Sequence, residues 1–136
     1  MELPGSVLHL MIMNLKQQEF SIKKRLKSFA YAWNGLKVLV KEEHNFRIHI
    51  VVTIGVVIFA ILLKISVYEW IAIVLAIGLV MAMEIINSAI ENMADFVSPE
   101  KHEMVKKIKD ISAAGVLICA VVTFLVGLII FLPKII

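Results

Sequence analysis

Residues 70–95 read WIAIVLAIGLVMAMEIINSAIENMAD, an apolar run that ends in polar side chains at regular intervals. Counted from Glu84, the polar residues stand three, four, seven and eleven positions further along, and this spacing places them on one face of an α-helix. The segment from Ile71 to Met83 carries no charge, so this face begins inside a membrane-spanning helix. A carboxylate within such a helix costs about 2.5–3.5 kcal/mol, which indicates a functional site. We call these residues the polar stripe: Glu84, Asn87, Ser88, Glu91 and Asp95.

The composition of the 136-residue chain is that of an integral membrane protein. Hydrophobic residues make up 60% of the chain and its mean hydropathy is +0.91, whereas an ordinary soluble domain has about 45–50% apolar residues. Its apolar runs predict an all-α membrane protein with an N-terminal amphipathic surface helix and three transmembrane helices. We expect an N-terminal extension over residues 1–18 and one membrane domain over residues 19–136. The surface helix is predicted at about 20–44, the spans at about 46–64, 69–95 and 111–132, and a cytoplasmic helix leading into the third span at about 98–110.

The distribution of basic residues predicts the orientation in the membrane. Lysine and arginine are frequent before the first span and between the second and third spans. The loop between the first two spans carries only Lys64, and the C-terminal tail carries only Lys134. By the positive-inside rule, the N-terminus and the end of the polar stripe face the cytoplasm, and the C-terminus lies outside.

Local signals predict where two helices begin or end. Ser98, Pro99 and Glu100 match an N-cap, a proline at the first helical position and an acid in the first turn, so a helix is predicted to start there. Pro133 is predicted to end the third span, because proline lacks the N–H that continues a helix.

The polar residues expected at the cytoplasmic end are suited to phosphate chemistry with a hard cation. Carboxylates from different helices, without soft ligands, favour Mg²⁺, which binds one or two carboxylates together with phosphate oxygens. An embedded carboxylate such as Glu84 is placed to take a proton from a lipid hydroxyl, and Lys109 can neutralise phosphate charge. These features outline a lipid kinase. The polar residues gathered at this end are Glu42, Glu43, Arg47, Glu84, Asn87, Glu91, His102, Glu103, Lys109 and Asp110.

Several familiar kinds of site are missing from the sequence. The histidines and Cys119 do not have the spacing of zinc ligands, and a single cysteine cannot form a disulfide within the chain. The sequence lacks the P-loop, the glycine-rich dinucleotide fingerprint and the nucleophile elbow of serine hydrolases, so a nucleotide must be held in another way. No nucleic acid is expected as a partner.

The string EIINSAIE over residues 84–91, followed by Asp95, resembles the signature of the small bacterial membrane kinases that phosphorylate diacylglycerol or undecaprenol. Three further blocks are similar to that family in order and spacing, and the resemblance covers about residues 24–132. It implies a homotrimer in the bacterial plasma membrane, active sites shared between protomers, and ATP with Mg²⁺ as the phosphoryl donor. The three blocks are Trp33-x-Gly35-Leu36, Glu43-x-x-Phe46-Arg47 and Lys109-Asp110-x-Ser112-Ala113-Ala114.

The same resemblance implies roles for individual residues. Glu84 resembles the catalytic base and Asn87 the neighbour that orients it, while Glu43 and Glu91 resemble metal ligands. The best-known members carry an arginine early in the surface helix, and here the phosphate-contacting role is open between Lys24 and Arg25, since lysine cannot make a bidentate grip. The positions that resemble nucleotide contacts are Lys24, Tyr31, Glu43, Glu91, Glu100, Lys101, His102, Lys109 and Asp110. Those that resemble lipid contacts are Lys27, Trp33, Phe46, Arg47, Glu84 and Ser112.

The sequence constrains the lipid acceptor less closely than the reaction. The segments at residues 41–43, 67–70 and 127–134 look most like the Gram-positive branch of the family, where the resemblance points to undecaprenol kinase, with diacylglycerol kinase as the alternative. An ion-conducting oligomer with Glu84 as the carrier site explains the embedded acid but not the clustering of charged residues at one face. A non-catalytic scaffold leaves the cost of Glu84 unexplained.

Overall fold

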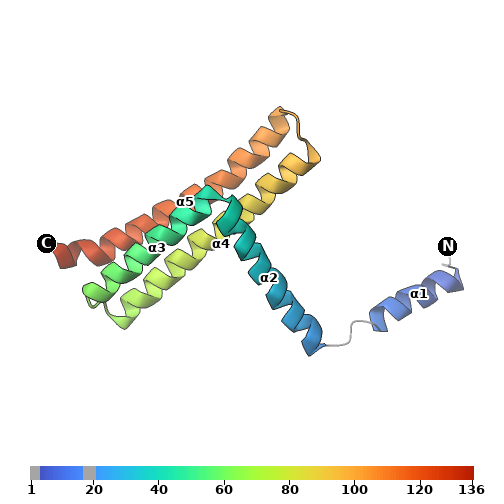
Figure 1. The fold of residues 1–136 in the computed structure, drawn as a ribbon, viewed down its shortest axis with the longest axis horizontal. Coiled ribbons are helices and arrows are strands. Elements are labelled where there is room, and N and C mark those ends of the chain that lie inside the picture. The colour runs from blue at the N-terminus through green and yellow to red at the C-terminus, as the bar shows by residue number, and fades with distance from the viewer. Residues whose placement is uncertain (1–3, 17–20) are drawn as a thin grey trace. The chain divides into compact units, whose positions relative to one another are not determined.

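The structure is a computed structural model that describes residues 4–16 and 21–136, and within these ranges it consists of five α-helices without strands (Figure 1). The all-helical prediction is therefore confirmed for the described residues. Three of these helices are long and apolar enough to cross a membrane, and they coincide with the three predicted spans. The helices are α1 (Gly5–Lys16), α2 (Ile22–Glu42), α3 (His44–Leu62), α4 (Val67–Val97) and α5 (Glu103–Ile135).

The chain divides into two compact units, Met1–Leu36 and Lys37–Ile136. The first unit contains α1 and most of α2, and no side chain of α2 is buried. The helix expected near the membrane surface therefore forms, while its position on that surface stays a prediction. The boundary predicted between residues 18 and 19, and the predicted start of the surface helix at residue 20, lie outside the described residues.

The second unit is built around a long helical hairpin. Figure 1 shows α4 and α5 running antiparallel, with α3 beside one half of their length. The α5 helix packs against α4 much more extensively than α3 does, and at Gly115 the two are so close that Met83 Cε lies 2.7 Å from the place of a Cβ. The buried apolar cluster lies near the α3–α4 turn and comprises Ala60, Ile65, Ile73 and Ile130.

The turn between α3 and α4 is closed by local hydrogen bonds. Lys64 adopts the left-handed conformation (φ 49°), which reverses the chain after α3. Ser66 and Glu69 form a capping box, in which the Glu69 N–H donates to Ser66 Oγ (3.3 Å) and the Ser66 N–H donates to Glu69 Oε2 (2.6 Å). Glu69 also pairs with Lys134 Nζ at 3.1 Å, which links the start of α4 to the last turn of α5.

Two predicted helix boundaries are wrong. Helix α5, which contains the third span, begins at Glu103 and not at Pro99. Its N-cap is His102, whose Nδ1 accepts the Met104 N–H at 3.1 Å. Ser98 instead closes α4, since its N–H donates to the Ala94 carbonyl. Nor does Pro133 end α5, which continues to Ile135. A proline in the last turn removes only one helical hydrogen bond, and the Ile136 N–H still reaches the Leu132 carbonyl.

Candidate functional site

The polar stripe is buried where it leaves the apolar part of α4. Glu84, Asn87 and Ser88 retain only 2%, 5% and 2% of their accessible surface, and they are the buried polar residues in the described ranges. Burying polar groups is costly unless they have partners, so the neighbours of these side chains indicate what the site can do. Glu91 is half-buried and Asp95 is exposed, so the stripe runs from the protein interior to its surface along one helix.

The carboxylate of Glu84 faces a histidine on α3. Its Oε2 atom lies 4.0 Å from His49 Nε2, and the His49 side chain is 24% exposed. The side chain of Asn45 and the carboxylates of Glu91 and Glu43 are its other polar neighbours. Glu84, the most deeply buried acid among the described residues, therefore lies among groups from α3, from α4 and from the junction before α3.

Asn87 links the buried and exposed parts of the stripe. Its Nδ2 donates to Glu91 Oε1 at 3.0 Å, as expected for side chains four positions apart on a helix. Its Oδ1 is buried and has no hydrogen-bond partner among the described residues. An unpartnered buried acceptor is uncommon, and it leaves one oxygen free to receive a donor or a cation.

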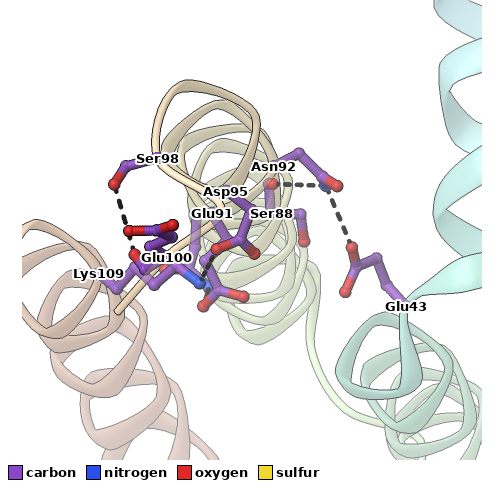
Figure 2. A network of polar contacts seen from close by, with 9 residues as sticks. Glu43, Ser88, Glu91, Asn92, Asp95, Ser98, Glu100 and Lys109 are labelled. Carbon is purple, nitrogen blue, oxygen red and sulfur yellow. Dashed lines mark hydrogen bonds and ion pairs between the residues drawn. The ribbon is translucent and has the colours of Figure 1, made fainter. Parts of the chain in front are cut away.

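Glu43 is brought to the stripe from the α2–α3 junction. Its backbone is extended (φ −101°, ψ 112°) and forms the N-cap position of α3, yet its side chain makes no capping hydrogen bond to that helix. Its Oε1 instead accepts a hydrogen bond from Asn92 Nδ2 on α4 at 3.3 Å (Figure 2). The two predicted metal ligands, Glu43 and Glu91, both lie near enough to Glu84 to act on it electrostatically. In the part of the chain that the structure describes, no three His, Cys, Asp or Glu side chains are grouped to hold a metal ion by themselves.

A hollow of about 520 Å³, lined mostly by charged and polar residues, lies at the α4–α5 connection. Lys109 of α5 forms an ion pair with Asp95 of α4 across it, as Figure 2 shows. Asp110 is not part of its lining and pairs with Lys106 at 2.6 Å. Of the predicted nucleotide contacts, the hollow brings together Glu100, Lys101, His102 and Lys109.

An apolar groove of about 420 Å³ runs along the bundle and is lined by α3, α4 and α5. At one end it includes His49, the residue that faces Glu84, and at the other it includes Ile135 near the end of α5. Between these ends the lining is almost entirely aliphatic and aromatic, with Thr53 and Thr123 as the polar exceptions. A groove of this kind suits a hydrocarbon chain.

The remaining predicted contacts have varied surroundings. Phe46 is buried at 3% exposure in the first turns of α3, and Arg47 and Ser112 are half-buried. On α2, in the first unit, Tyr31 and Trp33 are 69% and 62% exposed. The predicted contacts Lys24 and Lys27 are exposed on the same helix.

The sequence prediction missed two residues of this arrangement. His49 is not among the predicted site residues, although a histidine inside an otherwise apolar span is itself a signal. Asn92 stands four positions after Ser88, but its contact with Glu43 was not predictable, because the two residues are 49 positions apart. Both contacts depend on how α3 meets α4, which the sequence of either helix alone does not specify.

Comparison with known proteins adds independent information. A model of the prokaryotic diacylglycerol kinase family matches residues 30–131. The undecaprenol kinase of Bacillus subtilis (strain 168) is 34% identical over 122 residues, which cover 90% of this chain and 99% of the relative. The diacylglycerol kinase of Escherichia coli (strain K12) is 34% identical over 97 residues, or 71% of this chain and 80% of the relative. The diacylglycerol kinase of Helicobacter pylori (strain ATCC 700392 / 26695) is 34% identical over 96 residues, which cover 71% of this chain and 75% of the relative.

Proposed function

Because this chain belongs to the prokaryotic diacylglycerol kinase family, we propose that it is a membrane-embedded kinase that transfers the γ-phosphate of ATP to the hydroxyl of undecaprenol. Diacylglycerol is the alternative acceptor, since relatives of that name match over a large part of the chain. The single observation that carries this proposal is a buried carboxylate at the head of an apolar groove. His49 joins the two, because it faces Glu84 and also lines the groove.

Glu84 has the position required of a general base. A lipid whose tail enters the apolar groove presents its hydroxyl at the His49 end, within reach of the Glu84 carboxylate. Glu84 accepts the hydroxyl proton as the lipid oxygen bonds to the γ-phosphorus and the bond from that phosphorus to the leaving oxygen of ADP breaks. Burial of Glu84 at 2% exposure excludes water, which would otherwise compete with the lipid for the phosphoryl group.

The oxygen ligands present fit a divalent cation such as Mg²⁺. Glu43 and Glu91 supply two hard carboxylates from different parts of the chain, and Asn87 Oδ1 is a buried oxygen without a partner. Two protein carboxylates suffice for Mg²⁺ when phosphate oxygens complete its coordination. When bound, the ion would neutralise part of the charge that develops on the transferred phosphoryl group. Asn87 holds one of these carboxylates through its hydrogen bond to Glu91.

The hollow at the α4–α5 connection is the proposed nucleotide site. Lys109 and Lys101 line it and supply positive charge toward phosphate, and Glu100 and His102 supply polar contacts. Lys109 is held by Asp95, the last member of the polar stripe, so the nucleotide hollow and the base are joined along one face of α4. We include Asp110, Tyr31 and either Lys24 or Arg25 in the nucleotide contacts on the family resemblance. Lys27, Trp33, Phe46, Arg47 and Ser112 are proposed on the same basis as lipid contacts.

We also propose a homotrimer in the plasma membrane, with the N-terminus and the nucleotide site in the cytoplasm and the C-terminus outside. The topology is supported by the excess of lysine and arginine before α3 and between α4 and α5. The α4–α5 hairpin exposes many large apolar side chains, which lipid or neighbouring protomers must cover. Helix α2, with its lysines and exposed aromatic residues, is proposed to lie on the cytoplasmic membrane surface.

The purified protein is expected to phosphorylate undecaprenol in preference to diacylglycerol. The Bacillus subtilis relative aligns over nearly its whole length, and the groove offers a long aliphatic surface with few polar groups. The measurement is phosphate transfer from labelled ATP in detergent micelles, with the two lipids offered separately at the same mole fraction. A higher kcat/KM for diacylglycerol would assign the alternative acceptor and leave the kinase proposal intact.

A further inference from the structure

Asn92 joins two parts of the proposed site although the family resemblance assigns it no role. Its Nδ2 donates two hydrogen bonds, one to Glu43 Oε1 at 3.3 Å and one to the Ser88 carbonyl at 2.8 Å (Figure 2). The first bond crosses from α4 to the α2–α3 junction, and the second stays within α4. Asn92 therefore ties a carboxylate from outside α4 to the helix that carries Glu84 and Glu91.

The position of Glu43 needs such a restraint. It stands between two helices, in an extended backbone conformation, and its side chain makes no capping bond to α3. Since α3 packs against α4 over a limited area, packing alone gives the Glu43 carboxylate little restraint. A flexible glutamate that must meet a cation at a fixed point loses side-chain entropy when it binds. A hydrogen bond that holds it beforehand lowers that cost.

The geometry of Asn92 is suited to this task. The bond to the Ser88 carbonyl, four positions earlier, fixes the direction of the amide group. Both hydrogens of Nδ2 are then engaged, so the amide cannot turn away from Glu43 without losing a second bond. The preceding residue, Glu91, is held in turn by Asn87. Glu91 is therefore one of the two carboxylates of the proposed cation site, and the next residue of α4, Asn92, holds the other carboxylate, that of Glu43.

We propose that Asn92 is a positioning residue for divalent-cation binding, which holds Glu43 beside Glu91 through the amide-to-carboxylate hydrogen bond. This inference rests on the proposed function, because it takes Glu43 and Glu91 as the cation ligands. Asn92 does not itself touch the reacting atoms in this assignment. Its replacement should therefore act on cation affinity and much less on the rate of transfer once the cation is bound.

The test compares Asn92→Ala and Asn92→Leu, which both lack the donor, with Asn92→His, which keeps an N–H donor. Mn²⁺ binding to the full-length protein is measured by electron paramagnetic resonance with a non-hydrolysable ATP analogue and no lipid acceptor. We expect the alanine and leucine variants to bind Mn²⁺ about tenfold or more weakly, the cost typical of losing a partner that orients a metal ligand. The histidine variant should recover part of that loss. In turnover, the Mg²⁺ concentration for half-maximal rate should rise while kcat at saturating Mg²⁺ stays near that of the wild type.

Two further variants make the outcome specific. Met93→Ala changes the next residue of α4, which is 64% exposed, and should bind Mn²⁺ as the wild type does. Glu43→Gln removes the carboxylate itself and should weaken binding at least as much as Asn92→Ala. If Glu43→Gln weakens Mn²⁺ binding and neither Asn92→Ala nor Asn92→Leu does, the positioning role of Asn92 is refuted and the kinase proposal stands. If Glu43→Gln also binds Mn²⁺ normally, Glu43 is no ligand and the inference fails with that assignment.

Discussion

Glu84→Gln is expected to fold and to bind nucleotide but to transfer phosphate about 100 to 10,000 times more slowly than the wild type, the range typical of losing a general base. Glutamine has nearly the same shape and can still hydrogen-bond within the buried site, but it cannot accept the proton of the lipid hydroxyl. The effect should therefore appear in kcat. Single-turnover phosphate transfer to undecaprenol, together with binding of a fluorescent ATP analogue, measures the two properties separately.

The matched control for this variant is Glu69→Gln. Glu69 is another carboxylate of α4, but it lies in the first turn and pairs with Lys134. Its replacement should leave transfer close to the wild-type rate and affect only the stability of the end of the bundle where the first turn of α4 meets the last turn of α5. Near-wild-type turnover by Glu84→Gln would show that another group takes the proton, and the assignment of the base would then be wrong.

Glu91→Gln is expected to raise the Mg²⁺ concentration needed for half-maximal activity by about tenfold or more, since even the loss of a partner that orients a metal ligand costs 10–100-fold. The variant removes a carboxylate charge from the proposed cation site and also alters the acceptor of the Asn87 hydrogen bond. Titration of activity with Mg²⁺ at saturating ATP, and Mn²⁺ binding in the absence of lipid, give the two readouts.

The response to excess metal separates a ligand from a structural residue. If Glu91 is a ligand, high Mg²⁺ should restore a substantial part of the activity of Glu91→Gln. An unchanged metal dependence with reduced kcat would remove Glu91 from the ligand set, and the hydrogen bond from Asn87 would then be its main role. Glu69→Gln again serves as the control and should titrate with Mg²⁺ as the wild type does.

The course of the helices was predictable where a single periodic or hydropathic signal decides it. The uncharged run before Glu84 and the i, i+4 spacing of Asn87 and Glu91 are local properties, and the structure has both on α4. The start of α5 was not predictable in the same way. Ser98 and Pro99 make a plausible N-cap, but in the structure Ser98 is the C-cap of α4, and α5 begins only at Glu103 with His102 as its N-cap. Whether a serine between two helices caps the end of the first or the start of the second depends on the sequence and packing of both helices.

The residues of the candidate site were predictable from the sequence only where a single helix determines their arrangement. Residues on one helix, such as Glu84 and Asn87, could be assigned from their spacing and from the cost of burying them. The partners that reach them from other elements could not, because His49 faces Glu84, and Asn92 reaches Glu43, only once α3 lies against α4. The apolar groove is a further product of packing, since α3, α4 and α5 each contribute part of its lining.

The central claim, a kinase rather than an ion conduit built on Glu84, is tested most directly by one paired measurement on the same preparation. Wild-type protein is supplied with γ-labelled ATP, Mg²⁺ and undecaprenol in proteoliposomes, and labelled lipid and ion flux are recorded together. A kinase with Glu84 as its base should produce labelled undecaprenyl phosphate, no flux above empty liposomes, and almost no labelled lipid with Glu84→Gln. Flux that disappears with Glu84→Gln, in a folded sample that labels neither undecaprenol nor diacylglycerol, would contradict the proposal.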